Sequence, residues 1–186
     1  EGTEYLVFTH DHVDHIIIDE FDGNLENGME IAITAGNSGF ILFDQNGKRR
    51  AQSLMGHAQG LCAGRYRPDL PGKQFLVGCL WGNTGTRSLF SGNGEKLWTI
   101  EPDVTGAYDK KLRWAAGRDV FLVNSSVSAA GLYDGYGRRI IPFPEASELS
   151  AIDRTFWAQD FTGNGLDDFV IQGEDALFIY TQGDAI

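Results

Sequence analysis

Short apolar and β-branched segments alternate with polar, Gly-rich turns along the chain. The segments "FWAQ" and "FVIQ", which flank the loop at residues 160–168, have the length and composition of strands rather than helices. Turns at "DQNG", "SGNG" and "DGYG" carry the Gly, Asn and Asp residues that tight hairpins require. We find no helical periodicity longer than a turn or two. The pattern therefore predicts an all-β fold.

The strands are organised in repeats of about 45 residues. When "HVDHIIIDEF" from His12 is aligned with "HAQGLCAGRY" from His57, Phe21 falls on Tyr66, and "GNSG" and "GNTG" follow at similar distances. We expect one propeller segment with units at about 12–50, 57–102, 107–144 and 152–184, each of three or four strands. This predicts a β-propeller of about four blades that belongs to a larger ring, whose remaining blades are its partners. A β-sandwich is the alternative, but its strands would not repeat in this way.

The loop "DFTGNGLDDF" has oxygen-bearing side chains at positions 1, 3, 5 and 9, with glycines that allow a sharp turn. This spacing is suited to a hard cation, so we expect calcium here and at a related, longer loop in the first repeat. Alternatively, Asp and Asn are present only because they favour tight turns. The candidate ligands are Asp160, Thr162, Asn164, the Leu166 carbonyl and Asp168 in the last repeat, and Glu20, Asp22, Asn24 and Glu30 in the first.

Charge and hydropathy exclude some classes of partner. The chain of 186 residues has a formal net charge of −11, which disfavours non-specific nucleic-acid binding because that requires a basic face. No apolar stretch reaches eighteen residues, so we expect no membrane span. The two cysteines, Cys62 and Cys79, flank the turn "RPDLPGK". We expect them to face each other across a hairpin, either as buried free thiols or as a strained disulfide.

Four segments also resemble a known family. They are "GHAQGLCAGRYRPDLPGKQF", "WGNTGTRSLFSGNGEKLW", "LYDGYGRRIIPFP" and "DFTGNGLDDFVI". They resemble the C-terminal part of rhamnogalacturonan-lyase-like β-propellers, which are bacterial polysaccharide lyases. This resemblance implies a multi-bladed propeller, calcium, an extracellular or periplasmic setting, and cleavage of an acidic, pectin-like polysaccharide by β-elimination.

β-Elimination at a uronic acid needs a group that neutralises the carboxylate, a base and an acid. His12 and His57 occupy the same repeat position, each before the first strand of its unit, so we expect them to lie together at the site. The candidate catalytic residues are His12, His57, Arg65 and Arg67. The candidate substrate-binding residues are His10, His15, Trp81, Asn83, Arg87, Tyr133 and Arg138.

Two alternatives remain open at this stage. The segment "HDHVDH" is either a solvated strand entry, whose histidines bond to Asp11 and Asp14, or part of a zinc site, since alternate residues on a strand share a face. The chain as a whole is either part of a lyase or a non-catalytic, calcium-stabilised propeller that binds a glycan or a protein, because fold alone does not determine function.

Overall fold

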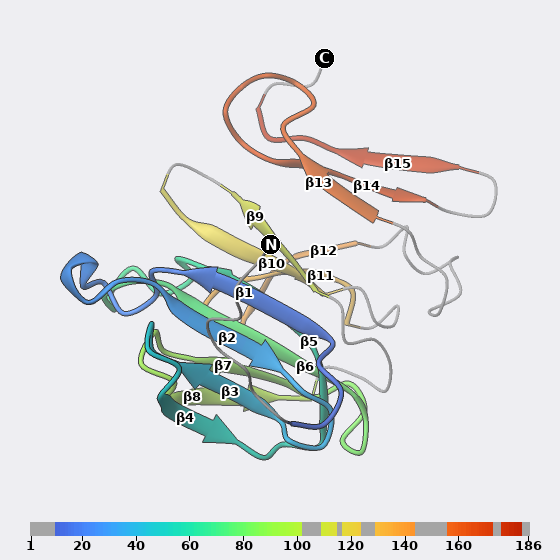
Figure 1. The fold of residues 1–186 in the computed structure, drawn as a ribbon. Coiled ribbons are helices and arrows are strands. Elements are labelled where there is room, and N and C mark those ends of the chain that lie inside the picture. Colours follow the sequence, from blue (N-terminus) through green and yellow to red (C-terminus); the bar gives the residue numbers. More distant parts are fainter. Residues whose placement is uncertain are drawn as a thin grey trace, which may run out of the picture.

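The computed structural model describes residues 10–101, 109–114, 117–123, 129–143, 156–172 and 176–183. These residues form four antiparallel sheets, in each of which consecutive strands are hydrogen-bonded neighbours. In Figure 1 the first two sheets lie side by side at the bottom, and the last sheet lies at the top. Small antiparallel sheets in series, each of three or four strands, confirm the predicted all-β, propeller-type fold class.

Each strand is short, as its apolar run predicts. The first sheet consists of β1 (His15–Asp19), β2 (Glu30–Thr34), β3 (Phe40–Phe43) and β4 (Arg49–Ser53). The second consists of β5 (His57–Gly64), β6 (Gln74–Trp81), β7 (Arg87–Phe90) and β8 (Lys96–Ile100). The third consists of β9 (Lys110–Arg113), β10 (Asp119–Val123), β11 (Gly131–Tyr133) and β12 (Arg139–Pro142). The last consists of β13 (Phe156–Gln159), β14 (Asp168–Gln172) and β15 (Leu177–Tyr180).

The only helix among the described residues is the 3₁₀ turn η1 (Leu25–Asn27), in the loop between β1 and β2. Asn24 caps it, since its side-chain oxygen accepts a hydrogen bond from the Glu26 amide. No helix in the described part of the chain is long and apolar enough to cross a membrane.

Aromatic clusters lie between adjacent sheets and hold them together. Phe40 stacks on Phe90 across the first two sheets, with ring centroids 4.6 Å apart. Phe121 and Tyr133 belong to the cluster between the second and third sheets, and Phe169 to the cluster between the third and the last. Burial of each such side chain contributes about 1.5–3 kcal/mol, so these clusters are the main cohesive force between sheets.

A polar contact also recurs between neighbouring sheets, always between residues 54 positions apart. Asp119 accepts a hydrogen bond from the Arg65 amide, and Asp167 accepts one from the Arg113 amide, each at 2.7 Å. Between the first two sheets, Lys73 instead donates to the Asp19 carboxylate. Each contact joins the end of one sheet's first strand to the start of the next sheet's second strand.

The two end sheets expose apolar side chains on their outer faces. Ile17 points into the cluster between the first two sheets, so Ile16 and Ile18, which alternate with it, point the opposite way and are more than half exposed. Trp157 and Ile179 are similarly exposed on the last sheet, on the face opposite Phe169. Inner faces are thus packed against neighbouring sheets, while these outer faces are not.

The prediction that the two cysteines face each other is wrong. Cys62 pairs with Leu76 and Cys79 with Ala58, because the β5–β6 hairpin is centred closer to Cys62 than the turn sequence suggests. An offset of three residues places the thiols on opposite faces of the sheet. Both are free, and burial raises the pKa of Cys62 to about 12 and that of Cys79 to about 11.

Candidate functional site

The connections between consecutive antiparallel strands lie alternately at the two ends of the strands, and so on two opposite faces of the molecule. We call one the hairpin face; it carries residues 20–29, 44–48, 65–73, 91–95, 134–138 and 160–167. We call the other the histidine face; it carries residues 10–14, 35–39, 54–56 and 82–86, with His57 at its border. The predicted ligand loops lie on the hairpin face, and the predicted histidine pair lies on the histidine face.

The structure brings His12 and His57 together across the first and second sheets. Their Nε2 atoms are 3.0 Å apart, and their ring centroids are 4.7 Å apart. His57 starts β5, and Trp81, which is 64% exposed, is its cross-strand partner on β6. The prediction that His12 and His57 lie together is therefore confirmed, while their chemical role stays a prediction.

Two carboxylates complete this cluster. Asp14 Oδ2 lies 3.3 Å from His12 Nε2, and Asp11 Oδ1 lies 3.3 Å from His12 Nδ1. Asp11 is held in place by the Asn37 amide, which donates to its other oxygen at 2.9 Å. Gly36 has φ +47°, and a Cβ there would lie 2.9 Å from both Asp11 and the His12 ring. A glycine at this position therefore makes room for the cluster.

Three other predicted residues of this face make contacts away from the cluster. His10 packs against Phe43, with ring centroids 5.8 Å apart. His15 Nδ1 lies 2.7 Å from the Gln59 carbonyl. Asn83 has φ +81° and donates to the Met55 carbonyl, so it shapes its turn.

On the hairpin face, an arginine lies between the acids of the first predicted calcium loop. Arg50 Nη1 donates to Asp22 at 2.8 Å and to Glu30 at 3.2 Å. Glu20 and Asp22 also accept backbone amides within the loop, from Gly23 and Asn24 respectively. Arg50 therefore offsets part of the negative charge of these acids, and the calcium site of this loop stays a prediction.

Burial raises the pKa of Glu30, because its side chain is fully enclosed, and the Phe21 amide and Arg50 only partly offset this effect. Asp22 is also penalised by desolvation, but its hydrogen bonds from Arg50 and Asn27 prevail and lower its pKa. Arg50 lowers the pKa of both carboxylates, but the net shifts have opposite signs, because desolvation outweighs the arginine at the more deeply buried Glu30.

The second predicted calcium loop is shaped by its own amides. Asp160 accepts from the amides of Gly163, Asn164 and Gly165, and Asp168 Oδ2 accepts from those of Phe161 and Thr162. The Thr162 hydroxyl also donates to Asp168, and the Asn164 side chain accepts from the Leu166 amide. Asp168 Oδ1 is buried without a hydrogen-bond partner among the described residues. This one oxygen is consistent with a cation ligand, and the calcium site stays a prediction.

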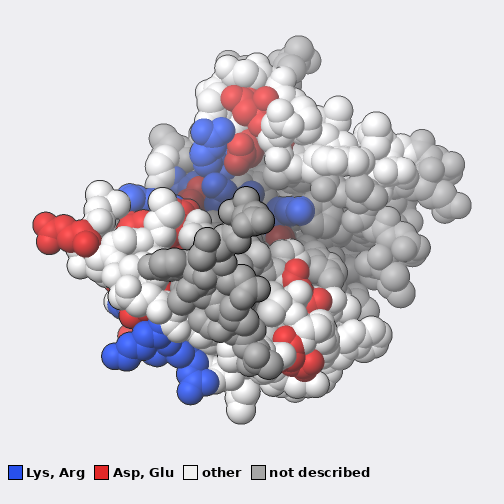
Figure 2. Space-filling view, viewed as in Figure 1, with Lys and Arg blue, Asp and Glu red and all other residues white. Residues whose placement is uncertain are grey.

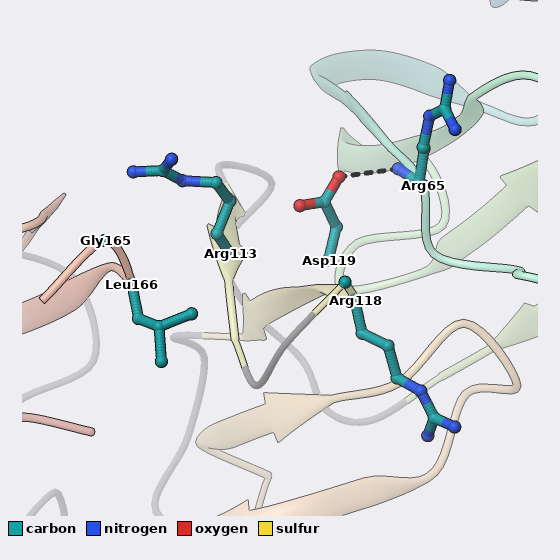
Figure 3. Close-up of a pocket in the computed structure, with 7 residues that line it drawn as sticks. Arg65, Arg113, Arg118, Asp119, Gly165 and Leu166 are labelled. Carbon is teal, nitrogen blue, oxygen red and sulfur yellow. Dashed lines mark hydrogen bonds between the residues drawn. The ribbon is translucent and has the colours of Figure 1, made fainter. Parts of the chain in front are cut away.

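Arginines gather on the hairpin face although the chain is acidic. Figure 2 shows Lys and Arg side chains on the left, between the last sheet and the others and again beside β4. A pocket of about 260 Å³ is lined by Arg65, Arg113 and Arg118 together with Asp119. In Figure 3 the three guanidinium groups point away from one another, while Asp119 faces the Arg65 backbone. The pocket therefore does not focus positive charge on one anion.

A larger cleft, of about 750 Å³, lies beside it between the second and third sheets. Tyr136 projects at its rim and is 47% exposed. The guanidinium carbons of Arg67 and Arg138 lie 4.2 and 5.1 Å from the centre of the Tyr136 ring, and its hydroxyl donates to Asp69. Sequence reasoning did not single out Tyr136 or this cleft, since the cleft forms only when two sheets stack.

Two predicted substrate-binding residues lie inside the protein. Arg87 is fully buried and pairs with Asp109, with Nε 2.9 Å from Oδ2. Tyr133 is 7% exposed, and its hydroxyl donates to the Ala129 carbonyl. Neither side chain faces solvent, because each fills the space where sheets pack together.

No protein-family model matches this chain, and no curated protein does. Among solved structures, it is similar to BBS1N in complex with ARL6DN. For a crystal soaked with lead, the TM-score is 0.58 at 9% identity, covering 96% of this chain and 55% of the other. For a crystal soaked with mercury, the TM-score is 0.55 at 12% identity, covering 90% and 48%. The chain thus spans about half the length of these fold neighbours.

These comparisons overturn the polysaccharide-lyase interpretation. Lyase activity, an acidic polysaccharide partner and an extracellular or periplasmic setting all rest on the resemblance to lyases. They are wrong, because the fold neighbours named above are BBS1N in complex with ARL6DN and no polysaccharide lyase is among them. Short glycine-rich turn segments occur wherever strands form hairpins. They therefore indicate the fold class but do not identify a family.

Proposed function

We propose that this chain is part of a non-catalytic β-propeller that binds a segment of another protein in the cleft between its second and third sheets. The cleft is the observation that carries the proposal. The fold neighbours support it, since BBS1N is a propeller solved in complex with ARL6DN. A shared fold does not transfer a partner, so the partner's chemistry is argued from the cleft itself.

The cleft combines an apolar lining with charges of both signs. Tyr66, Pro68, Trp114, Val120 and Ile140 supply apolar surface. Asp119 and Asp134 line it beside Arg118 and Arg138; Asp134 pairs with Arg138, whereas Arg118 has no ion pair among the described residues and is the cation that a partner's acid would meet. Such a concave surface, lined by aromatic and Arg side chains, is typical of binding hot spots. It fits an extended segment that carries apolar and acidic side chains.

Hydrogen bonds restrict the orientation of the exposed Tyr136 ring. Tyr136 lies in the tight turn that follows β11, and Asp134 braces this turn by accepting from the Tyr136 and Arg138 amides. Its hydroxyl donates to Asp69 at 3.1 Å, across the gap between the two sheets. Because these contacts already restrict the ring, little conformational entropy is lost when a partner packs against it.

The test is fluorescence anisotropy of the whole chain with labelled peptides. One peptide set combines aromatic and acidic residues, and a matched set has the acids replaced by Lys. We expect the acidic set to bind at least about tenfold more tightly, since each lost charge-assisted contact costs about 1.4 kcal/mol or more. Tyr136→Ala and Arg118→Glu should each weaken the acidic set about tenfold.

Arg49→Glu is the matched control, because Arg49 is exposed on β4 and is not part of the cleft lining. It makes the same charge change as Arg118→Glu and should leave the affinity nearly unchanged. Equal losses for both variants would mean that only overall charge matters, and equal binding of the two peptide sets would overturn the proposed site.

A further inference from the structure

Three potential ligand atoms converge on the histidine face: His12 Nε2, His57 Nε2 and Asp14 Oδ2, all within 4.8 Å of one another. They come from two different sheets. His12 and Asp14 precede β1, where the Asp14 amide is bonded to the Thr34 carbonyl of β2. His57 begins β5, and the Ala58 amide that follows it donates to the Gly36 carbonyl of the first sheet. Backbone hydrogen bonds therefore fix the position of each contributing segment.

Hydrogen bonds alone do not satisfy this cluster when the His12 ring is neutral. His12 Nε2 has two neighbours, His57 Nε2 at 3.0 Å and Asp14 Oδ2 at 3.3 Å, but a ring nitrogen carries at most one proton. Its Nδ1 faces Asp11, which accepts only, so the His12 proton of a neutral ring belongs on Nδ1. His12 Nε2 then presents a lone pair to a carboxylate, and Asp14 Oδ2 remains a buried oxygen without a hydrogen-bond donor among the described residues.

A cation between the three atoms removes this conflict. We propose that His12, Asp14 and His57 bind a divalent transition-metal ion of the zinc type, which joins the first and second sheets. Two imidazole nitrogens and one carboxylate oxygen are a common ligand set for such ions. At usual zinc–ligand lengths, neighbouring ligand atoms of a tetrahedral site are about 3.3 Å apart. The two pairs that include His12 lie at 3.0 and 3.3 Å, and His57 Nε2 and Asp14 Oδ2 lie within 4.8 Å of each other.

The surroundings support a metal ligand at His12. Metal-bound histidine usually donates its other ring N–H to a carboxylate, which orients the ring. Asp11 lies in this position, 3.3 Å from Nδ1, and is itself fixed by the Asn37 and His12 amides. Gly36 leaves the space that the Asp11 carboxylate and the His12 ring occupy.

The site is open on one side, since the His12 side chain is 55% exposed. With three protein ligands, the fourth position is therefore accessible to water or to a side chain of a bound protein. The proposal does not rest on the protein-binding function, because the cleft lies on the opposite, hairpin face.

The test is calorimetric titration of the chelator-treated whole chain with Zn²⁺, and absorption spectroscopy of the same chain with Co²⁺. We expect one saturable zinc site and the intense visible bands of tetrahedral Co²⁺. His12→Ala, His57→Ala and Asp14→Asn should each weaken zinc binding about 100-fold or more. Asp11→Asn, which removes only the orienting carboxylate, should weaken it about 10- to 100-fold.

His10→Ala is the matched control, because His10 belongs to the same segment but packs on Phe43. It should bind zinc as the parent does. Circular dichroism without metal shows whether each variant folds, and the parent's Co²⁺ spectrum tests the site even if a variant does not. Absence of a one-to-one site in the parent, or an equal loss in His10→Ala, would overturn the proposal.

Discussion

Two clusters of side chains that could hold a metal ion lie at opposite strand ends of the first sheet, and they differ in how their charges are satisfied. On the hairpin face, Glu20, Asp22 and Glu30 come close enough for one ion. Arg50 already lies between Asp22 and Glu30, however. On the histidine face, no arginine or lysine contacts Asp14 in the described residues, and its buried Oδ2 accepts no hydrogen bond.

The difference shows that proximity of ligand atoms is not sufficient evidence for a site. A guanidinium group that donates to two carboxylates fills the role of a bound cation and makes the acids structural. Where no such group is present, the ligand atoms remain available to an external ion. Arg87 is a further case of a charge paired inside the protein, with Asp109.

Removing Arg50 should make the acidic cluster resemble the histidine cluster, and this change has the largest expected effect on stability. In Arg50→Ala, Glu30 is left fully buried without its cation, which should lower the free energy of unfolding by about 1–3 kcal/mol. The three acids should then bind calcium, so that millimolar Ca²⁺ restores much of this loss. Urea unfolding with Ca²⁺ or with chelator measures both effects.

Arg49→Ala is the control for that experiment, since the Arg49 side chain bonds only to Gln52 among the described residues. It should change stability by less than about 0.5 kcal/mol and create no response to calcium. If Arg50→Ala is no less stable than Arg49→Ala, the guanidinium is not what balances this cluster.

The loop at residues 160–168 tests an intermediate case, in which amides satisfy all but one carboxylate oxygen of Asp160 and Asp168. If Asp168 Oδ1 binds calcium, Ca²⁺ should raise the thermal midpoint of the parent by several degrees, roughly 2–4 °C per kcal/mol. Asp168→Ala should lose this shift. Asp44→Ala is the control: it removes a carboxylate that accepts backbone amides in another hairpin turn, and it should retain the calcium-dependent shift. If calcium does not change the thermal midpoint of the parent, the loop is a simple turn and not a calcium site.

The smallest expected effect concerns pH. Burial raises the pKa of Glu30, so the folded state holds this proton more tightly than the unfolded state does. The resulting stability is present below the unfolded pKa and is lost as pH rises through the folded pKa. Glu30→Gln cannot ionise, so its stability relative to the parent should increase between about pH 3 and about pH 7. Parallel urea titrations of both proteins measure this difference.

For Asp69→Asn we expect the opposite change of stability with pH. The Arg67 side chain lowers the pKa of Asp69, so its contribution is present above the unfolded pKa and is lost as pH falls through the folded pKa. The stability of Asp69→Asn relative to the parent should therefore decrease slightly over the same range. If both variants shift in the same direction, burial is not what distinguishes the two acids.

The strand pattern and the repeat alignment predicted the fold class and the meeting of His12 with His57. Both depend on local spacing: strands need alternating or apolar runs, and equivalent positions in neighbouring repeats point the same way. The same reasoning failed for Cys62 and Cys79, because bulges and the true centre of the hairpin set the register of β5 and β6. It also failed for the family, since hairpin turns of similar sequence occur in many β proteins.

By itself, the sequence determined that short strands would form a propeller-type series of sheets and that acids and histidines would gather at loop positions. Only the tertiary structure decided which of these groups are already neutralised. Arg50 is 20 residues from Glu30 and Asp109 is 22 from Arg87 along the chain, yet each pair is in contact. Such partners are chosen by the stacking of strands and sheets. Whether a carboxylate is structural or free to bind therefore depends on distances that no local pattern encodes.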